Sequence, residues 1–143
     1  MPKKTKSKGV AAEKKHTWRV FSEYIRRRDA FEFSGDADGM AKCCTCKNVS
    51  HWKDLQAGHG LAGRNNGILF EEKCCKAQCR SCNVYGGGKP DEYHDLLIDE
   101  IGAEGFQELV KQKHTTKRYT AIELKEMRDE YQAKINDLLE KSF

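Results

Sequence analysis

The stretch that decides the fold runs from residue 43 to residue 83 and reads CCTCKNVSHWKDLQAGHGLAGRNNGILFEEKCCKAQCRSCN. It contains all seven cysteines of the 143-residue chain. Its aliphatic residues are too few for a conventional core, so something other than hydrophobic burial must stabilise it. Clustered cysteines in a reducing compartment are more often metal ligands than disulfides. The spacing of the cysteines is therefore the first clue to the fold.

Four of the cysteines form two C-x2-C pairs, Cys43 with Cys46 and Cys79 with Cys82, separated by 32 residues. Each pair can bend around one ion, and together they provide the tetrahedral thiolate set that zinc prefers. Four protein ligands leave no open coordination position, so the predicted zinc is structural and contributes folding energy.

The other three cysteines leave alternatives open. Cys44 could compete with Cys43, and a pair formed by Cys74 and Cys75 could replace one of the C-x2-C pairs. Neither alternative gives two matched pairs, so we expect these three cysteines to be small buried residues.

Between the two pairs the pattern predicts a hairpin. Apolar and polar residues alternate from Leu55 into His59, a Gly- and Asn-rich turn follows, and a return strand passes through residues 75–79. A turn of helix bearing Cys82 and Asn83 comes next. This order of strand, loop, strand and helix places His59 near Asn83.

Outside this segment the sequence predicts a basic N-terminal part and a helical C-terminal part. We expect a disordered basic tail over residues 1–15, a helix over 16–31, a zinc-bound core over 40–88 and a helical region over 89–143. In the last region Thr120 and Glu123 have the spacing of a capping box that opens the final helix. The apolar face of that helix either packs on its own domain or forms a homodimer contact.

The composition limits the possible function. Charged residues make up 34% of the chain, and no apolar run is long enough for a membrane helix, so we expect no membrane partner. The net charge is +4, but residues 1–28 carry +8 and the remainder carries −4. The N-terminus lacks a signal peptide, which predicts the cytoplasm, and the host-cell cytoplasm if a phage encodes the protein.

The motifs in the central stretch resemble those of the ββα-metal nucleases, also called HNH or His-Me finger nucleases. They resemble more closely the family of the phage recombination protein NinG, also called Rap. The resemblance is carried by AGH at residues 57–59 and QCRSCN at residues 78–83, and it extends through FSEYIRRRDA at residues 21–30 and EYHDLL at residues 92–97. An asparagine directly after the last of four zinc-binding cysteines is also similar to phage endonuclease VII, a junction resolvase.

This resemblance implies a small α+β fold with a zinc-stapled ββα-metal core and helices on either side. It also implies that His59 is the general base and that Asn83 is a ligand of a catalytic Mg²⁺ or Mn²⁺ ion. A neutral imidazole can take a proton from water near pH 7, and the ion can stabilise charge on the phosphate.

The sequence departs from the family pattern at three positions. Gly58 stands where many relatives have a metal-binding Asp, so a second oxygen ligand must come from Asp54 or, as an alternative, from Gln56. Cys74 replaces the central Asn of the pattern, and Lys76 replaces a frequent His.

Basic residues near these motifs are candidate DNA contacts. Arg26, Arg27 and Arg28 cannot all face the core, and each exposed cation that neutralises a phosphate strengthens binding in a salt-dependent way. Arg64, Lys76 and Arg80 lie close in sequence to the expected site and are further candidates.

Together these features predict an endonuclease that cuts branched DNA in phage recombination, such as Holliday junctions or displacement loops. The alternatives are a non-catalytic zinc-knuckle protein that binds DNA and a general HNH nicking nuclease. Two coordinated cuts at a junction favour a homodimer, with the last helix as its interface.

Overall fold

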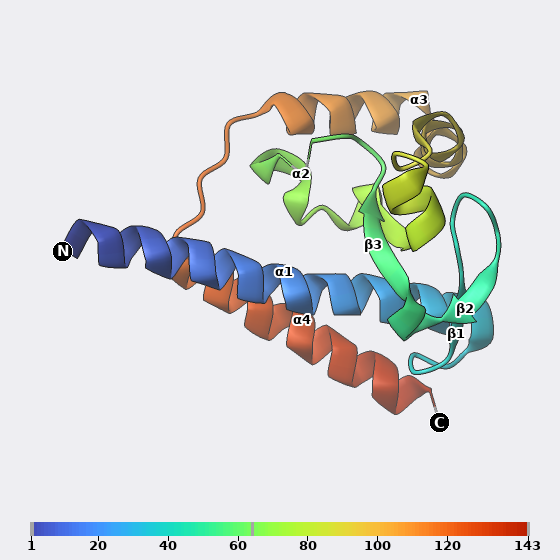
Figure 1. Cartoon of the computed structure of the whole chain (residues 1–143), viewed down its shortest axis with the longest axis horizontal. Coiled ribbons are helices and arrows are strands. Elements are labelled where there is room, and N and C mark those ends of the chain that lie inside the picture. Colours follow the sequence, from blue (N-terminus) through green and yellow to red (C-terminus); the bar gives the residue numbers. More distant parts are fainter. Residues whose placement is uncertain (1, 64, 143) are drawn as a thin grey trace.

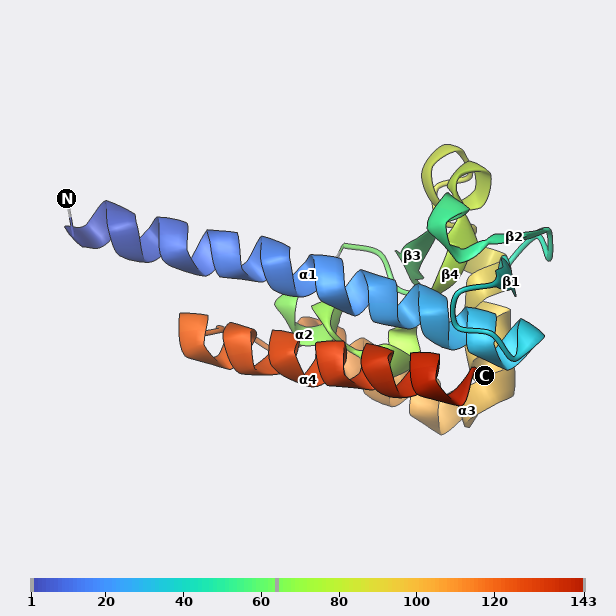
Figure 2. The same cartoon turned by 90° about the horizontal axis from the view of Figure 1, so that it is seen from below.

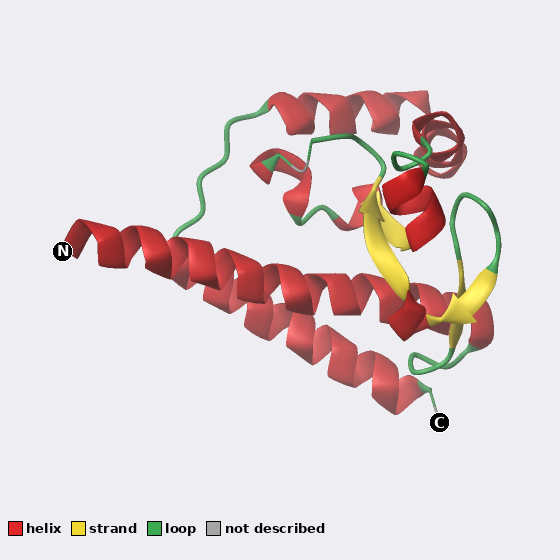
Figure 3. Ribbon diagram, viewed as in Figure 1, coloured by secondary structure: helices red, strands yellow, loops and turns green. Residues whose placement is uncertain are grey.

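The computed structural model describes residues 2–63 and 65–142, with side chains from residue 9 onward. It is a mixed α+β protein whose long helices pack around two small antiparallel sheets (Figures 1 and 3). In chain order the elements are α1 (Pro2–Ser34), β1 (Met40–Lys42), β2 (Val49–His51), the 3-10 turn η1 (Trp52–Asp54), β3 (Leu55–His59), α2 (Asn66–Leu69), the 3-10 turn η2 (Glu72–Cys74), β4 (Cys75–Cys79), the π-helical turn η3 (Ser81–Tyr85), α3 (Pro90–His114) and α4 (Ala121–Lys141). The predicted α+β class is confirmed.

Helix α1 corrects the prediction for the front of the chain. We expected a disordered tail over residues 1–15 and a separate helix over residues 16–31. The structure instead has one helix from Pro2 to Ser34 that contains both segments. Much of the supposed tail consists of Lys, Ala and Glu, which favour helix wherever packing supports it.

Contacts with α4 supply that support. Val10 packs against the core, and Glu13 forms an ion pair with Arg128 of α4. Thr17, near the start of the helix expected over residues 16–31, is buried inside α1 and donates a 2.8 Å hydrogen bond to the carbonyl of Leu124. The helix therefore continues through the position at which the sequence suggested a start.

Helix α4 begins at the predicted cap, because the Thr120 hydroxyl accepts a 3.1 Å hydrogen bond from the amide of Glu123. It lies beside α1 and runs in the same direction (Figures 1 and 2). Leu124, Tyr131 and Ile135 are buried. The face that we considered for a homodimer is therefore packed within the same chain, and the homodimer stays a prediction without an assigned interface.

Strands β3 and β4 form the hairpin expected from the alternating pattern, with Leu55 opposite Cys79 and His59 opposite Cys75. On one face Ala57 and Ala77 pack towards α1, where their small side chains allow close approach. The other face carries Gly58, whose carbonyl accepts a 2.6 Å hydrogen bond from the hydroxyl of Tyr93 in α3. The hairpin is thus held between α1 and α3.

A second hairpin, β1 with β2, carries the first cysteine pair in its turn. The amide of Cys43 donates to the carbonyl of Asn48 at 2.8 Å, and the amide of Lys47 donates to the carbonyl of Cys43 at 3.0 Å. Lys47 has a φ of 70°, a left-handed conformation that tightens the turn. The turn bends the chain so that both cysteines face the same point.

Helix α3 is broken at Gly102, whose φ of 79° and ψ of 167° are not helical. Its two halves point in different directions (Figure 1). Leu97 in the first half and Leu109 in the second are both buried in one cluster with Ile68 of α2. The break therefore lets both halves cover the same side of the core. None of the helices within the described residues has an apolar stretch long enough to cross a membrane.

Candidate metal and catalytic site

The four cysteines of the two C-x2-C pairs come together as predicted. The sulfur atoms of Cys43, Cys46, Cys79 and Cys82 all lie within 4.8 Å of one another. Two turns far apart in the sequence provide them, one between β1 and β2 and the other between β4 and η3. Four thiolates at one point could hold a metal ion such as zinc.

Backbone amides donate to two of the sulfur atoms, and they favour the thiolate form at Cys43, whereas the pKa values of Cys46, Cys79 and Cys82 are raised. The amide of Cys79 donates to the sulfur of Cys43 at 3.3 Å, and the amide of Cys82 donates to the sulfur of Cys79 at 3.4 Å. Burial opposes ionisation, but the amides of Cys46 and Cys79 outweigh it and lower the pKa of Cys43 to about 6. A thiolate, the form that binds a metal, is therefore favoured at Cys43 near neutral pH.

The other three cysteines lie outside the cluster. Cys74 and Cys75 are buried in two different apolar clusters. Cys44 is half-buried, and its burial raises its pKa to about 12. Burial likewise raises the pKa values of Cys74 and Cys75. These groups remain thiols, which supports the matched pairs over the alternatives in which Cys44 or Cys74 and Cys75 bind the metal.

His59 ends β3 and is held from two sides. Its Nε2 lies 3.0 Å from the carbonyl of Leu69. A carbonyl can only accept, so the proton is on Nε2 and the lone pair of the neutral ring is on Nδ1. The ring of Trp18 from α1 stacks on the imidazole, with centroids 5.2 Å apart and planes 22° apart. The orientation of the imidazole is therefore fixed by α1 and by the end of α2.

His59 and Asn83 line the same hollow, as the predicted order of elements implied. The hollow has a volume of about 290 Å³, and Trp18, Gly87 and Gly88 also line it. Asn83 lies in η3, directly after Cys82. The turn η3 therefore contributes one residue to the four-cysteine cluster and the next residue to the hollow. The structure thus brings together the two residues for which the resemblance implies the roles of base and metal ligand.

Gln56, and not Asp54, accompanies Asn83. The Asn83 Nδ2 group donates a 2.7 Å hydrogen bond to Gln56 Oε1. Both residues line a second hollow of about 370 Å³, which Trp18 and Arg26 also line. Asp54 is exposed at the end of η1 and lines neither hollow. The alternative ligand Gln56 therefore fits this site better than the first choice, Asp54.

Packing explains why residue 58 is glycine here. A Cβ atom at residue 58 would overlap Gln78 Oε1 and would lie 3.1 Å from Asn83 Oδ1. Gln78 is fully buried, and its Nε2 group donates to Thr45 Oγ1 and to the Gly88 carbonyl. An Asp at this position would require Gln78 to move, so the site is built without that carboxylate.

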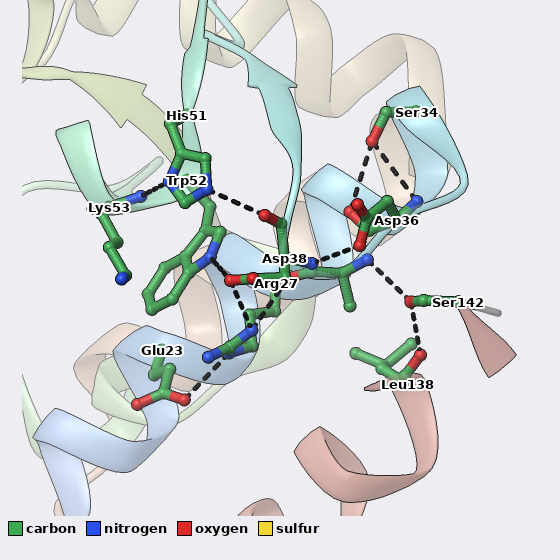
Figure 4. Close-up of polar contacts among 11 residues, drawn as sticks. Glu23, Arg27, Ser34, Asp36, Asp38, His51, Trp52, Lys53, Leu138 and Ser142 are labelled. Carbon is green, nitrogen blue, oxygen red and sulfur yellow. Dashed lines mark hydrogen bonds and ion pairs between the residues drawn. The ribbon is translucent and has the colours of Figure 1, made fainter. Parts of the chain in front are cut away.

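The three consecutive arginines have different surroundings. Arg27 binds Glu23, the Ala37 carbonyl and Asp38, and its guanidinium lies 4.1 Å from the ring centroid of Trp52 (Figure 4). Its side chain is only 13% exposed. Arg27 therefore ties α1 to the loop before β1 and to η1.

Arg28 also has structural contacts. Arg26 donates to the Ser22 carbonyl at 3.1 Å and lies 5.0 Å from the ring centroid of Trp52, and it also reaches the hollow. Arg28 donates to the carbonyls of Glu72 and Cys75 at 3.1 and 2.8 Å, which attaches α1 to the start of β4. Arg26 lines the hollow that contains Gln56 and Asn83. Of the three arginines, Arg26 is the one placed beside the candidate site.

The remaining predicted contacts are scattered. Lys76 forms a 2.7 Å ion pair with Glu100 of α3 and does not line the hollow of His59. Arg80 is exposed at the start of η3. Arg64 lies outside the described residues.

Trp18 is the site residue that the sequence analysis missed. Its spacing placed it on the apolar stripe of the first helix, and it does contact Phe21 and Phe70. Nothing in that spacing distinguishes it from a core residue. Only the packing of α1 across the hairpin places its ring on His59.

Comparison with known proteins gives a consistent match. The family model described as "Bacteriophage Lambda NinG protein" matches residues 2–141. The chain is 30% identical to protein ninG of Escherichia phage lambda and 29% identical to protein ninG of Salmonella phage P22, each over 107 residues. These matches cover 74% of this chain and 52% of each relative, so the chain spans about half the length of the curated relatives it matches. No solved structure matches it.

Proposed function

The chain belongs to the NinG family of bacteriophage proteins, and from this premise we propose that it is a divalent-metal-dependent endonuclease that cuts branched DNA during phage recombination. The observation that carries the proposal is the hollow shared by His59 and Asn83, directly beside the four-cysteine cluster. The order of β3, loop, β4 and η3 agrees with the ββα-metal architecture that the resemblance implies, and this order supports the proposal.

In the proposed reaction His59 is the general base. Its Nε2 proton is held by the Leu69 carbonyl, so Nδ1 takes the proton of a water molecule. The water oxygen attacks phosphorus, the bond from phosphorus to the 3′ oxygen breaks, and the 3′ oxygen takes a proton from solvent. The Trp18 ring limits rotation of the imidazole and so keeps Nδ1 directed at one position.

The residues in the hollow fit a hard divalent cation in ligand type. Asn83 Oδ1 and Gln56 Oε1 are amide oxygens, which Mg²⁺ and Mn²⁺ accept as ligands. A bound ion would stabilise the negative charge on the phosphate and on the departing 3′ oxygen. No carboxylate lines either hollow in the described part of the chain, so phosphate oxygens of the substrate complete the charge balance.

The chain that forms the hollow of His59 lacks acidic residues, which suits the binding of a polyanion such as DNA. The sequence holds no Asp or Glu from Leu55 to Phe70 or from Lys73 to Pro90, the stretches that form β3, β4 and η3. Arg26 adds positive charge in the neighbouring hollow that Asn83 also lines. Contacts of this kind bind phosphates without reading sequence, which agrees with selection by DNA structure.

Two arginine variants separate DNA binding from folding. Arg26→Ala is expected to weaken DNA binding on the order of tenfold at low salt, because one phosphate contact is lost. It should lower the stability less than Arg28→Ala does, because Arg26 binds one carbonyl of its own helix and one aromatic ring. Arg28→Ala is expected to lower the free energy of unfolding by about 2 kcal/mol, because two buried carbonyls lose a charged donor. Fluorescence anisotropy and urea unfolding measure the two effects. The assignment fails if Arg26→Ala alone destabilises the fold.

The choice between Gln56 and Asp54 as the second metal ligand is tested by adding a negative charge at residue 56 and, separately, removing one at residue 54. Gln56→Asp is expected to strengthen Mn²⁺ binding by about tenfold, because a carboxylate adds negative charge to the site. Asp54→Asn should leave the affinity unchanged, because Asp54 lies outside the hollow. Electron paramagnetic resonance of free Mn²⁺ in zinc-loaded protein gives both affinities. Weaker binding in Asp54→Asn would identify Asp54 as the ligand instead.

The proposed function itself is tested by a cleavage assay that compares a four-way junction with linear duplex across Mg²⁺, Mn²⁺ and Ca²⁺. Zinc is measured on the same preparation. We expect junction cutting that requires Mg²⁺ or Mn²⁺. Equal cutting of both substrates would indicate a general nicking nuclease.

One observation favours a second candidate, a DNA-binding recombination protein without nuclease activity. The hollow of His59 lacks the carboxylate that many ββα-metal nucleases use, since residue 58 is glycine. Junction binding without cleavage under any of the three cations would support this alternative.

A further inference from the structure

The last residues of α3 and the start of the segment that follows, Lys111–Arg118 and called the linker here, are fixed to Asn65 and Asn66, which follow the candidate base in sequence. Asn65 Nδ2 donates to the carbonyl of Lys113 at 3.4 Å, and Asn66 Nδ2 donates to the carbonyl of Lys117 at 3.0 Å. The hydroxyl of Tyr119 donates back to the carbonyl of Asn66 at 2.8 Å. This linker is therefore an anchored part of the fold, with its backbone turned towards α2.

The anchored linker presents positive charge to solvent. Its sequence from Lys111 to Arg118 is KQKHTTKR, and no Asp or Glu occurs between Glu108 and Glu123. Lys113, Thr115 and Lys117 line a hollow of about 410 Å³ together with the two asparagines that anchor the linker. Ammonium groups, hydroxyls and amides are the donors that proteins use for phosphate oxygens.

The linker hollow adjoins the hollow of His59. Gly63 lines the hollow of His59, and a Cβ atom at Gly63 would lie 3.8 Å from the Cε atom of Lys113. Residues 61–63 thus line the hollow of His59, and Asn65 and Asn66, a short way along the chain, line the linker hollow. A nucleic-acid strand that reaches His59 would pass the linker on one side.

The lysines in this hollow are available to a ligand. In the described part of the chain Lys113 forms no ion pair, and Lys117 has a long ion pair of 3.7 Å with Glu123 and lies 5.1 Å from the ring centroid of Tyr119. Lys117 is 47% exposed. Neither lysine is needed for a buried charge pair, which distinguishes them from Arg27 and Arg28.

We propose that the linker Lys111–Arg118, with Asn65 and Asn66, is a second phosphate-binding surface that holds the DNA backbone next to the scissile phosphate. This inference rests on the proposed function in taking DNA as the ligand. It assigns the linker a role separate from chemistry, because it holds no base or metal ligand of the proposed reaction. It adds Lys113 and Lys117 to the contacts that the sequence suggested.

The test is DNA binding by the full chain with zinc bound and no other divalent ion, so that no cleavage is required. The double variant Lys113→Gln with Lys117→Gln is compared with the double variant Lys125→Gln with Lys141→Gln, whose exposed lysines lie on α4. Both variants lose two positive charges. Anisotropy of a labelled four-way junction over a salt series gives the affinity and its salt dependence.

We expect the linker variant to bind on the order of tenfold more weakly and to reduce the slope of log K against log salt by about 2, since each lost phosphate contact removes about 0.9. The α4 variant should bind nearly as the wild type does. Equal weakening in the two variants would show an effect of net charge alone and would overturn the proposal, as would unchanged binding in the linker variant. Unaltered thermal unfolding of both variants confirms that folding is not the cause.

The DNA-binding test of the linker does not depend on whether the protein cuts DNA. A wild-type protein that binds junctions and never cuts them would remove the nuclease proposal and leave the linker result standing. A wild-type protein that cuts, together with a linker variant that binds normally, would remove only the linker proposal. A wild-type protein that binds no DNA would overturn both.

Discussion

The variant His59→Ala is expected to cut DNA about 10²–10⁴ times more slowly than the wild type, which is the usual contribution of a general base. The imidazole is the one titratable side chain that lines the hollow with Asn83, so no neighbouring group replaces it among the described residues. DNA binding and zinc content should be unchanged, because His59 lies outside the four-cysteine cluster. A quantitative junction-cleavage assay with Mg²⁺ measures the effect.

The matched control is His16→Ala, which removes an exposed histidine from α1. It should cut at the wild-type rate. A second variant, His59→Asn, keeps a polar side chain at the end of β3 and guards against loss of folding. Undiminished cutting by either folded His59 variant would contradict the proposed mechanism.

Loss of one cysteine of the cluster is expected to have the largest effect on stability. In Cys82→Ser the zinc content should fall from one ion per chain to nearly none. Structural zinc in small domains contributes an apparent binding free energy of about 10–16 kcal/mol, so losing the metal removes much of the stability of residues 43–83. We expect the midpoint of thermal unfolding to fall by more than about 10 °C, since 1 kcal/mol corresponds to roughly 4 °C at this size.

Atomic emission spectroscopy and circular dichroism measure the zinc content and the unfolding. Cys44→Ser is the matched control, because Cys44 is next to Cys43 in sequence but lies outside the cluster. It should keep its zinc. Loss of zinc in Cys44→Ser with retention in Cys82→Ser would mean that the ligand set is wrong.

Local sequence signals predicted the features that depend on spacing. The two C-x2-C pairs specified the four-cysteine cluster, because their spacing alone limits how a chain can surround an ion. Alternation from Leu55 to His59 predicted β3, and the order of elements placed Asn83 beside it. The cap at Thr120 was also visible, since a capping residue acts on its own helix.

Features that depend on contacts between distant segments could not be predicted in this way. The continuation of α1 through Thr17 follows from its packing on α4, and the contact of Trp18 with His59 follows from the path of α1 across the hairpin. Asp54 was preferred for its carboxylate, but residue 54 lies before the strand, whereas Gln56 lies within it and contacts Asn83. The sequence favoured Asp54 as the second ligand, whereas the geometry of the strand favours Gln56.

Because α1 lies across the hairpin, residues 40–88 do not contain the whole candidate site. Residues 40–88 contain every cysteine, His59 and Asn83, yet Trp18, Arg26 and the carbonyl-binding Arg28 all come from α1. Transplanting that segment into another scaffold would transfer its metal ligands without the opposite wall of its hollow. A minimal functional unit therefore has to begin upstream of Trp18, and its boundary is set by a helix that contains none of the cysteines.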